Sequence, residues 1–161
     1  MGCERLKGGA MFGKKADETK ATFTDDQKSE LAERLFIMLR VQTVVPANPV
    51  RVTKIEITKG HINRKAIGYI YGFIDSALQY RGEDITNPSI GLPIIYHVLR
   101  KLFPGHEHEY TDFLMAHMDD EIVVLGMMEG GQEYSEFIHQ SDPNGKAWPM
   151  GLARFILDGK E

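Results

Sequence analysis

Histidines and carboxylates recur at helical spacing in the second half of the sequence. Side chains three or four positions apart lie next to each other on a helix, so such pairs can bind a metal ion or exchange a proton. The chemistry that these residues suggest is metal-assisted or acid–base catalysis. The pairs are His108 with Asp112, His117 with Glu121, and Glu136 with His139.

The first and last of these pairs are better interpreted as solvated surface. A di-iron site in a helical bundle needs two Glu-x-x-His motifs and two further glutamates, and Glu136 and His139 supply a single motif. On a helical projection these two side chains point away from the apolar side of their helix. His108 and Asp112 lie on an acidic side as well, and charged faces are usually exposed. No metal and no other cofactor is predicted.

His117 and Glu121 differ, because they lie at the border of an apolar arc on a helix expected over about 106–128. A carboxylate on an apolar face is costly unless it is paired. One interpretation is a catalytic, ligand-binding or metal site at these two residues, with a tyrosine such as Tyr71 or Tyr96. The other is a structural pair in which Glu121 meets Arg34, Arg64 or a tyrosine hydroxyl, since buried ion pairs often have no chemical role.

Other catalytic motifs are absent from the sequence. It has no Gly-x-Ser-x-Gly elbow and neither of the two glycine-rich phosphate loops. The single cysteine, Cys3, lies in a segment without periodicity, where no active site is expected around it. These absences count against an enzyme of nucleotide chemistry and leave other kinds of enzyme open, so the sequence leans toward a protein that is not an enzyme without deciding the question.

A stripe of small residues points instead to contact between helices. Gly68, Gly72 and Ser76 recur every four residues in a helix expected over 62–80. A glycine inside a helix costs about 1 kcal/mol relative to alanine, so two of them suggest that packing requires them. Small residues in a row let another backbone approach closely. The approaching element is either a second helix of this chain or a second subunit.

Met127 and Met128 suggest an interface as well, because methionine adapts to irregular contacts. The first hypothesis is therefore a protein-interaction or regulatory module that self-associates, as a homodimer or another homo-oligomer, or binds a partner protein. The interface residues expected are Gly68, Gly72, Ser76, Met127 and Met128. The alternative is a small-ligand or metal-assisted enzyme with its site at His117 and Glu121.

Hydrophobic periodicity predicts six helices that must position these residues. The first opens at Thr24 with a capping box completed by Gln27, and ends near Thr43. Gly82 is placed to cap the end of the second. Residues 50–58 have strand character but no partner strand, so we expect them to cross the helices or pair in a dimer. The remaining helices are expected at about 87–103, 106–128, 132–140 and 147–157, with Gly130-Gly131 ending the long one.

The amino-acid composition limits which class of protein this chain can belong to. The 161 residues carry 19 Lys+Arg against 23 Asp+Glu, a net charge of −4, which gives no general electrostatic case for nucleic acid. One cysteine cannot form a disulfide within the chain, and no apolar run is long enough to span a membrane. We expect a cytoplasmic protein without membrane contact. The expected fold is an all-α, single-domain bundle over 23–161, with a short extended segment.

Residues 1–22 are expected to form a flexible or disordered N-terminal arm. The arm is basic, with Arg5 and lysines at 7, 14, 15 and 20. A weaker third hypothesis is a nucleic-acid-associated factor that uses this arm, although no aromatic residues alternate with the lysines to stack on bases. The sequence leaves open whether Met1 or Met11 is the natural start.

Overall fold

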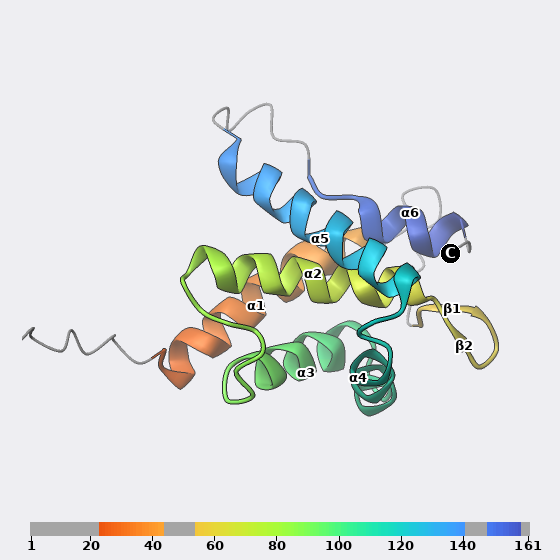
Figure 1. Ribbon diagram of the computed structural model, residues 1–161, viewed down its shortest axis with the longest axis horizontal. Helices are drawn as coiled ribbons and strands as arrows, with labels where there is room; N and C mark the ends of the chain where they lie inside the picture. Colours follow the sequence, from red (N-terminus) through yellow and green to blue (C-terminus); the bar gives the residue numbers. More distant parts are fainter. Residues whose placement is uncertain (1–22, 44–53, 141–147, 159–161) are drawn as a thin grey trace, which may run out of the picture.

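The computed structural model describes residues 23–43, 54–140 and 148–158, and in these residues the chain is all-α with one small β-hairpin (Figure 1). The arm expected over 1–22 lies outside the described residues, as do residues 44–53, 141–147 and 159–161. No described helix is both long and apolar enough to cross a membrane. The elements in chain order are α1 (Asp25–Gln42), β1 (Glu56–Thr58), β2 (His61–Ile62), α2 (Arg64–Tyr80), α3 (Gly91–Leu102), α4 (Glu107–Ala116), α5 (Glu121–His139) and α6 (Gly151–Asp158).

Helix α2 lies in the middle of the bundle (Figure 1). It contacts α5 and α6 on one side and α3 and α4 on the other, while α1 packs against α3 and α6. Eleven of its 17 residues are buried, including Phe73 and Ile74 at 0% exposure. The helix is therefore buried almost all round, which is wider than the half-buried pattern expected from the sequence.

The small-residue stripe of α2 is filled by α5. A Cβ atom added at Gly68 would overlap the backbone carbonyl of Val123, and one added at Gly72 would overlap that of Met127. Only glycine fits at either position. Of the two interpretations of the stripe, a second helix of the same chain is the one that the structure contains.

Helix α5 contributes glycines to the same contact. A Cβ atom at Gly126 would overlap the Lys65 carbonyl, and one at Gly130 would overlap the Tyr69 carbonyl. We call Gly68, Gly72, Gly126 and Gly130 the glycine seam. The contacts advance together along both helices, so α2 and α5 run in the same general direction with their backbones touching.

The helices over 106–139 begin and end at other places than the sequence predicts. The expected helix over 106–128 is interrupted, because α4 ends at Ala116 and α5 begins at Glu121. Asp120 caps α5, with its side chain accepting from the N–H groups of Ile122 at 2.9 Å and Val123 at 3.3 Å. Gly130-Gly131 does not end α5, which runs on through the expected 132–140 helix. Packing of the seam against α2 supports the helix there.

Two other helices also begin at different residues. Asn87 forms a turn, in which its side-chain oxygen accepts from the backbone N–H and the hydroxyl of Ser89. Helix α3 then starts at Gly91, with Pro93 in its first turn, where proline is tolerated. Helix α6 starts at Gly151 rather than near 147. By contrast, the capping box of Thr24 and Gln27 and the glycine conformation at Gly82 (φ +74°) are confirmed.

The segment before α2 forms a hairpin, so the expectation that it has no partner strand is wrong. Strand β1 pairs antiparallel with β2, and Gly60 supplies the turn with φ +81°. The backbone N–H of Ile55, just before β1, donates to the hydroxyl of Tyr110 at 3.2 Å. This bond ties the hairpin to α4.

Asn63, which follows β2, caps α2. Its side-chain oxygen accepts from the Ala66 N–H at 2.8 Å, and its amide group donates to the Phe155 carbonyl at 3.1 Å. Because Asn63 is 2% exposed, this one side chain fixes both the start of α2 and the position of α6.

Candidate functional site

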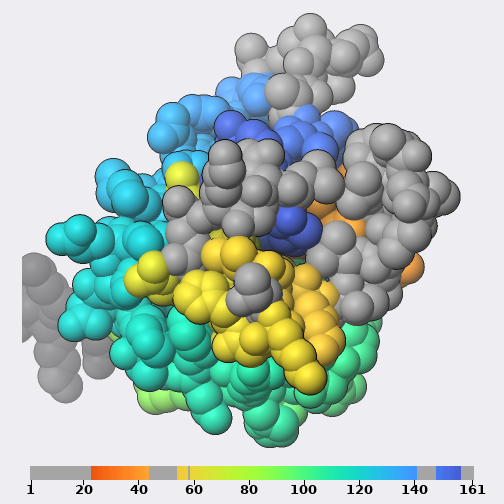
Figure 2. Space-filling model, turned by 90° about the vertical axis from the view of Figure 1, so that its right-hand side faces the viewer, coloured from red at the N-terminus to blue at the C-terminus, as the bar shows by residue number. Residues whose placement is uncertain are grey.

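A cleft of about 560 Å³ lies between the hairpin, α4 and the α4–α5 junction. In Figure 2 the hairpin (yellow) faces the viewer, with α4 (teal) and the start of α5 (cyan) beside it. Small-molecule sites have volumes of about 300–1,000 Å³, and this cleft lies within that range. We call it the hairpin cleft, and it is lined by Gly60, His61, Ile62, Arg64, Glu109, Phe113, His117 and Asp120.

His117 is fixed in this cleft by the turn of α4 that precedes it. Its Nδ1 lies 2.8 Å from the Phe113 carbonyl oxygen, and its ring stacks on the Phe113 ring with centroids 4.1 Å apart. A carbonyl oxygen only accepts, so Nδ1 carries the proton of the neutral ring. Nε2 then has a lone pair, and it bonds to no other described residue. His117 can therefore accept a hydrogen bond or a proton from a ligand.

Asp120 lines the same cleft, and its carboxylate is held by backbone N–H groups and by the charge of an arginine. Besides capping α5, its carboxylate accepts from the Arg64 guanidinium at 3.0 Å. Burial raises the pKa of the Asp120 carboxyl, but the N–H groups of Ile122 and Val123 together with Arg64 outweigh it and hold the pKa below its usual value. Asp120 is therefore a carboxylate at neutral pH.

Of the predicted pair, only His117 lines the cleft. Spacing of four residues brings side chains together within one helix, but His117 ends α4 whereas Glu121 begins α5 and is exposed. The two tyrosines considered with this pair lie elsewhere. Tyr71 is buried in a separate hollow, and the Tyr96 hydroxyl bonds to Nε2 of His108 at 2.9 Å.

The other histidine–carboxylate pairs also have different partners. Glu136 accepts from Gln132 at 2.7 Å, and Nδ1 of His139 bonds to the Ser135 carbonyl at 2.7 Å. Within the described part of the chain, no three His, Cys, Asp or Glu side chains gather closely enough to hold a metal ion.

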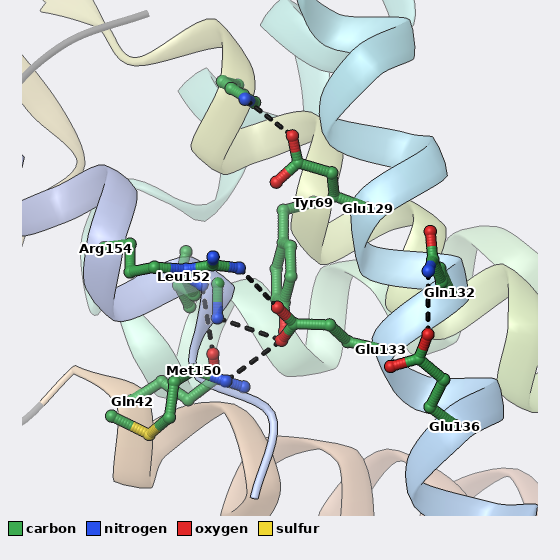
Figure 3. Close-up of polar contacts among 11 residues, drawn as sticks. Gln42, Tyr69, Glu129, Gln132, Glu133, Glu136, Met150, Leu152 and Arg154 are labelled. Atoms are coloured by element: carbon green, nitrogen blue, oxygen red, sulfur yellow. Dashed lines mark hydrogen bonds and ion pairs between the residues drawn. The ribbon is translucent and has the colours of Figure 1, made fainter.

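A second polar cluster lies where α5 meets the start of α6 (Figure 3). The Glu133 carboxylate accepts from the Tyr69 hydroxyl at 2.8 Å, from the N–H groups of Met150 and Gly151 at 3.0 Å each, and from Arg154 at 2.6 Å. Burial, and then the adjacent Glu133, raise the pKa of the Tyr69 phenol far above its ordinary value. The phenol thus stays protonated and donates.

Gln42 completes this cluster from α1. Its side-chain oxygen accepts from the Leu152 N–H at 3.1 Å. The N–H groups at the start of a helix have no partner within that helix, and for α6 they are satisfied by side chains of α5 and α1. We therefore assign this cluster a structural role, which is to hold α6 against the bundle.

Some of the predicted interface residues are buried in the structure, and others are exposed to solvent. Gly68 and Gly72 are buried in the glycine seam. Met127 packs against the core, whereas Met128 is 65% exposed. Ser76, farther along the stripe, lies near Gly131 of α5.

Leu125 is 51% exposed although it is a large apolar residue. The interruption between α4 and α5 sets which residues of α5 face the core. Leu125 and Met128, three positions apart, lie next to each other on the outer face of α5.

Apart from His117, sequence reasoning identified none of the residues that line the hairpin cleft as site residues, among them Arg64, Glu109, Phe113 and Asp120. Asp120 could have been found, because an aspartate directly before an apolar run is a helix-start signal. Its recognition would have separated α4 from α5 and placed His117 at a helix end. Arg64 and Phe113 carry no such signal, since their roles depend on how the elements pack.

Comparison with known proteins gives no relative from which a function could be transferred: no protein-family model matches the chain, and neither a curated protein nor a solved structure matches it significantly.

Proposed function

We propose that the protein binds a small ligand that donates hydrogen bonds, in the hairpin cleft. The observation that carries the proposal is the Nε2 atom of His117, an acceptor with no partner among the described residues, in a cleft of about 560 Å³. A binding site of this kind combines an apolar wall with a few fixed polar groups. Phe113 supplies the wall, and the Nδ1–carbonyl bond fixes the polar atom.

The charges in the cleft indicate which donors fit. Glu109 and Asp120 contribute two carboxylates against the single guanidinium of Arg64. Glu109 also meets Nδ1 of His106 at 3.1 Å. A negative lining with a histidine acceptor favours an amine, an amidine or another cationic N–H donor over an anion.

The test is an NMR titration of the full chain with two probes of similar shape, benzamidine and benzoate. We expect benzamidine to shift the resonances of His117 and Phe113 in a saturable way, and benzoate to shift neither. The variant His117→Ala should abolish the effect. His139→Ala is the matched control, because His139 makes the same bond to a backbone carbonyl outside this cleft. Equal binding of benzoate, or undiminished binding to His117→Ala, contradicts the proposal.

Self-association through the outer face of α5 is the second candidate. It is favoured by the exposure of Leu125 and Met128, at 51% and 65%, on adjacent positions of one helix. Paired exposed apolar side chains are typical of contact surfaces. The glycine seam does not contribute to this candidate, because α5 of the same chain covers it.

Sedimentation of the full chain over a range of concentrations tests the second candidate. We expect a concentration-dependent dimer that Leu125→Glu with Met128→Glu converts to a monomer. Ile37→Glu with Val41→Glu introduces the same charges at exposed apolar positions of α1, which are 53% and 50% exposed, and should leave the dimer intact. A wild-type chain that is monomeric at every concentration removes the candidate.

A further inference from the structure

A second hollow, unrelated to the hairpin cleft, lies between α2, α3 and the end of α4. It has a volume of about 250 Å³. Leu92 and Met115 at its rim are 40% and 42% exposed. We call it the methionine groove, and its apolar lining comes from Tyr71, Ile85, Leu92, Ile95, Met115 and Met118. An exposed apolar hollow with flexible methionines suits an inserted apolar side chain.

The mouth of the groove is acidic. The Asp84 carboxylate accepts from the N–H and the hydroxyl of Thr86, which lines the groove. Burial raises the pKa of the Tyr71 phenol, and the nearby carboxylates of Asp75 and Asp84 raise it further. Both acids therefore lie close to the Tyr71 side of the groove.

Acids outnumber cations around this mouth. Residues 82–99 and 102–145 contain no lysine or arginine, so α4 has no lysine or arginine beside its acids, and the segment between α2 and α3 has Glu83 and Asp84 against the single cation of Arg81, which lies near Tyr134 of α5. The cations of α2 and α3 are at Arg64, Lys65, Arg100 and Lys101, at the ends of these helices away from Asp75 and Leu92. An occupant of the groove should thus combine an apolar anchor with positive charge.

The chain contains such a segment in residues 11–15. Its sequence, Met-Phe-Gly-Lys-Lys, places two large apolar side chains next to two lysines. The first turn of α1, at Lys28 and Ser29, lies against Pro93 of α3, and Leu92 of the groove is the neighbouring residue. The ten residues between Phe12 and Phe23 can span up to about 35 Å, several times the width of one helix.

We infer that residues 11–15 bind the methionine groove of their own chain, with Met11 and Phe12 inserted between Met115 and Leu92. Lys14 and Lys15 then lie against Asp75 and Asp84. This assigns the basic N-terminal segment an acidic protein surface as its partner.

The full chain allows a direct test, because Cys3 is its only cysteine. A nitroxide is attached to Ala10→Cys in a Cys3→Ser background, and the methionine methyl groups are observed by NMR. We expect strong paramagnetic broadening of Met115 and Met118, and none of Met128 or Met150. The variant Lys14→Glu with Lys15→Glu should remove the broadening. Lys7→Glu with Lys20→Glu changes the charge equally outside the segment and should preserve it.

Three outcomes overturn the inference. The first is the absence of selective broadening at Met115 and Met118. The second is equal loss of broadening in the control variant, which shows unspecific attraction. The third is broadening that appears only between spin-labelled and isotope-labelled chains in a mixture, which identifies a second copy as the occupant. All substitutions lie outside the folded core, so circular dichroism should show the same helix content in each variant.

Discussion

The carboxylate of Glu133 caps a helix other than its own, since it lies 3.0 Å from the backbone nitrogen of Gly151 in α6. An N-terminal cap usually comes from the residue just before the helix. Here α5 supplies it, and the same carboxylate binds Tyr69 and Arg154. The attachment of α6 therefore depends on a residue that precedes it by 18 positions.

We expect Glu133→Ala to lower the free energy of unfolding by about 1–3 kcal/mol, because it leaves the part-buried Tyr69 hydroxyl and Gly151 N–H without their acceptor. Urea denaturation followed by circular dichroism measures the loss. Glu136→Ala, one turn further along α5, removes only an exposed bond to Gln132 and should change the stability by less than about 0.5 kcal/mol. Equal losses in the two variants would disprove the capping role of Glu133.

The neighbouring glycines of α5 should respond oppositely to alanine. At Gly130 a Cβ atom would overlap the Tyr69 carbonyl, whereas at Gly131 it would lie 3.4 Å from the Gly72 carbonyl oxygen, an ordinary contact. We expect Gly130→Ala to destabilise the fold by about 2–3 kcal/mol through overpacking. Gly131→Ala should stabilise it by up to about 1 kcal/mol through helix propensity. Thermal unfolding distinguishes them, and a stabilising Gly130→Ala would show that the backbones do not touch.

Stability should fall steeply above pH 10, and Tyr110 is one of several buried tyrosines that cause the fall, since burial raises the pKa of the Tyr69, Tyr71 and Tyr134 phenols as well. Burial raises the pKa of the Tyr110 phenol to about 12, although the Ile55 N–H opposes the shift. The unfolded chain, with a pKa near 10, loses the proton first. The contribution is therefore complete below pH 10 and is lost as the pH rises through 12, by roughly 2 kcal/mol in all.

Unfolding in urea at a series of pH values measures this dependence. Tyr110→Phe should make the decline between pH 10 and 12 less steep, at the cost of the bond to Ile55. Tyr80→Phe, at a position that is 63% exposed, serves as the control and should leave the decline unchanged. A wild-type stability that is constant up to pH 12 would contradict the prediction.

Substitution of Asn63 should lower the free energy of unfolding by more than the loss of an ordinary helix cap does. Asn63→Ala removes the cap of α2 and leaves the Phe155 carbonyl without its donor, so we expect a loss of about 2 kcal/mol. Asn63→Ser retains a capping oxygen and should lose about half as much. Chemical denaturation of both variants gives the comparison. Equal losses would show that the capping oxygen contributes nothing, and no loss in Asn63→Ser would show that the bond to Phe155 contributes nothing.

The sequence predicts helices best where the signal is local. The capping box at Thr24 and Gln27 and the glycine at 82 depend on their immediate neighbours, and both predictions are confirmed. Gly130-Gly131 is a helix stop by the same local rules. It is wrong here because close contact with α2, which is distant in sequence, stabilises the helix through both residues.

The candidate site was only half predictable for the same reason. His117 was selected from its spacing, and it lines the hairpin cleft. Its expected partner Glu121 does not, because the chain turns at Asp120 and the rules for one helix no longer apply. Arg64 and Phe113 reach the cleft from α2 and α4, and periodicity within one helix gives no information about such contacts.

The glycine seam also has a consequence for how the protein opens. Where side chains separate two helices, a rotamer change can loosen the contact locally, but along the seam the backbones themselves touch. Helices α2 and α5 can then separate only if each moves as a rigid body, with no local loosening of the contact. Amide protons beside the seam should exchange with solvent only when the whole molecule unfolds, whereas those of α6, a helix of eight residues that makes no backbone contact of this kind with the described residues, should exchange earlier through local opening.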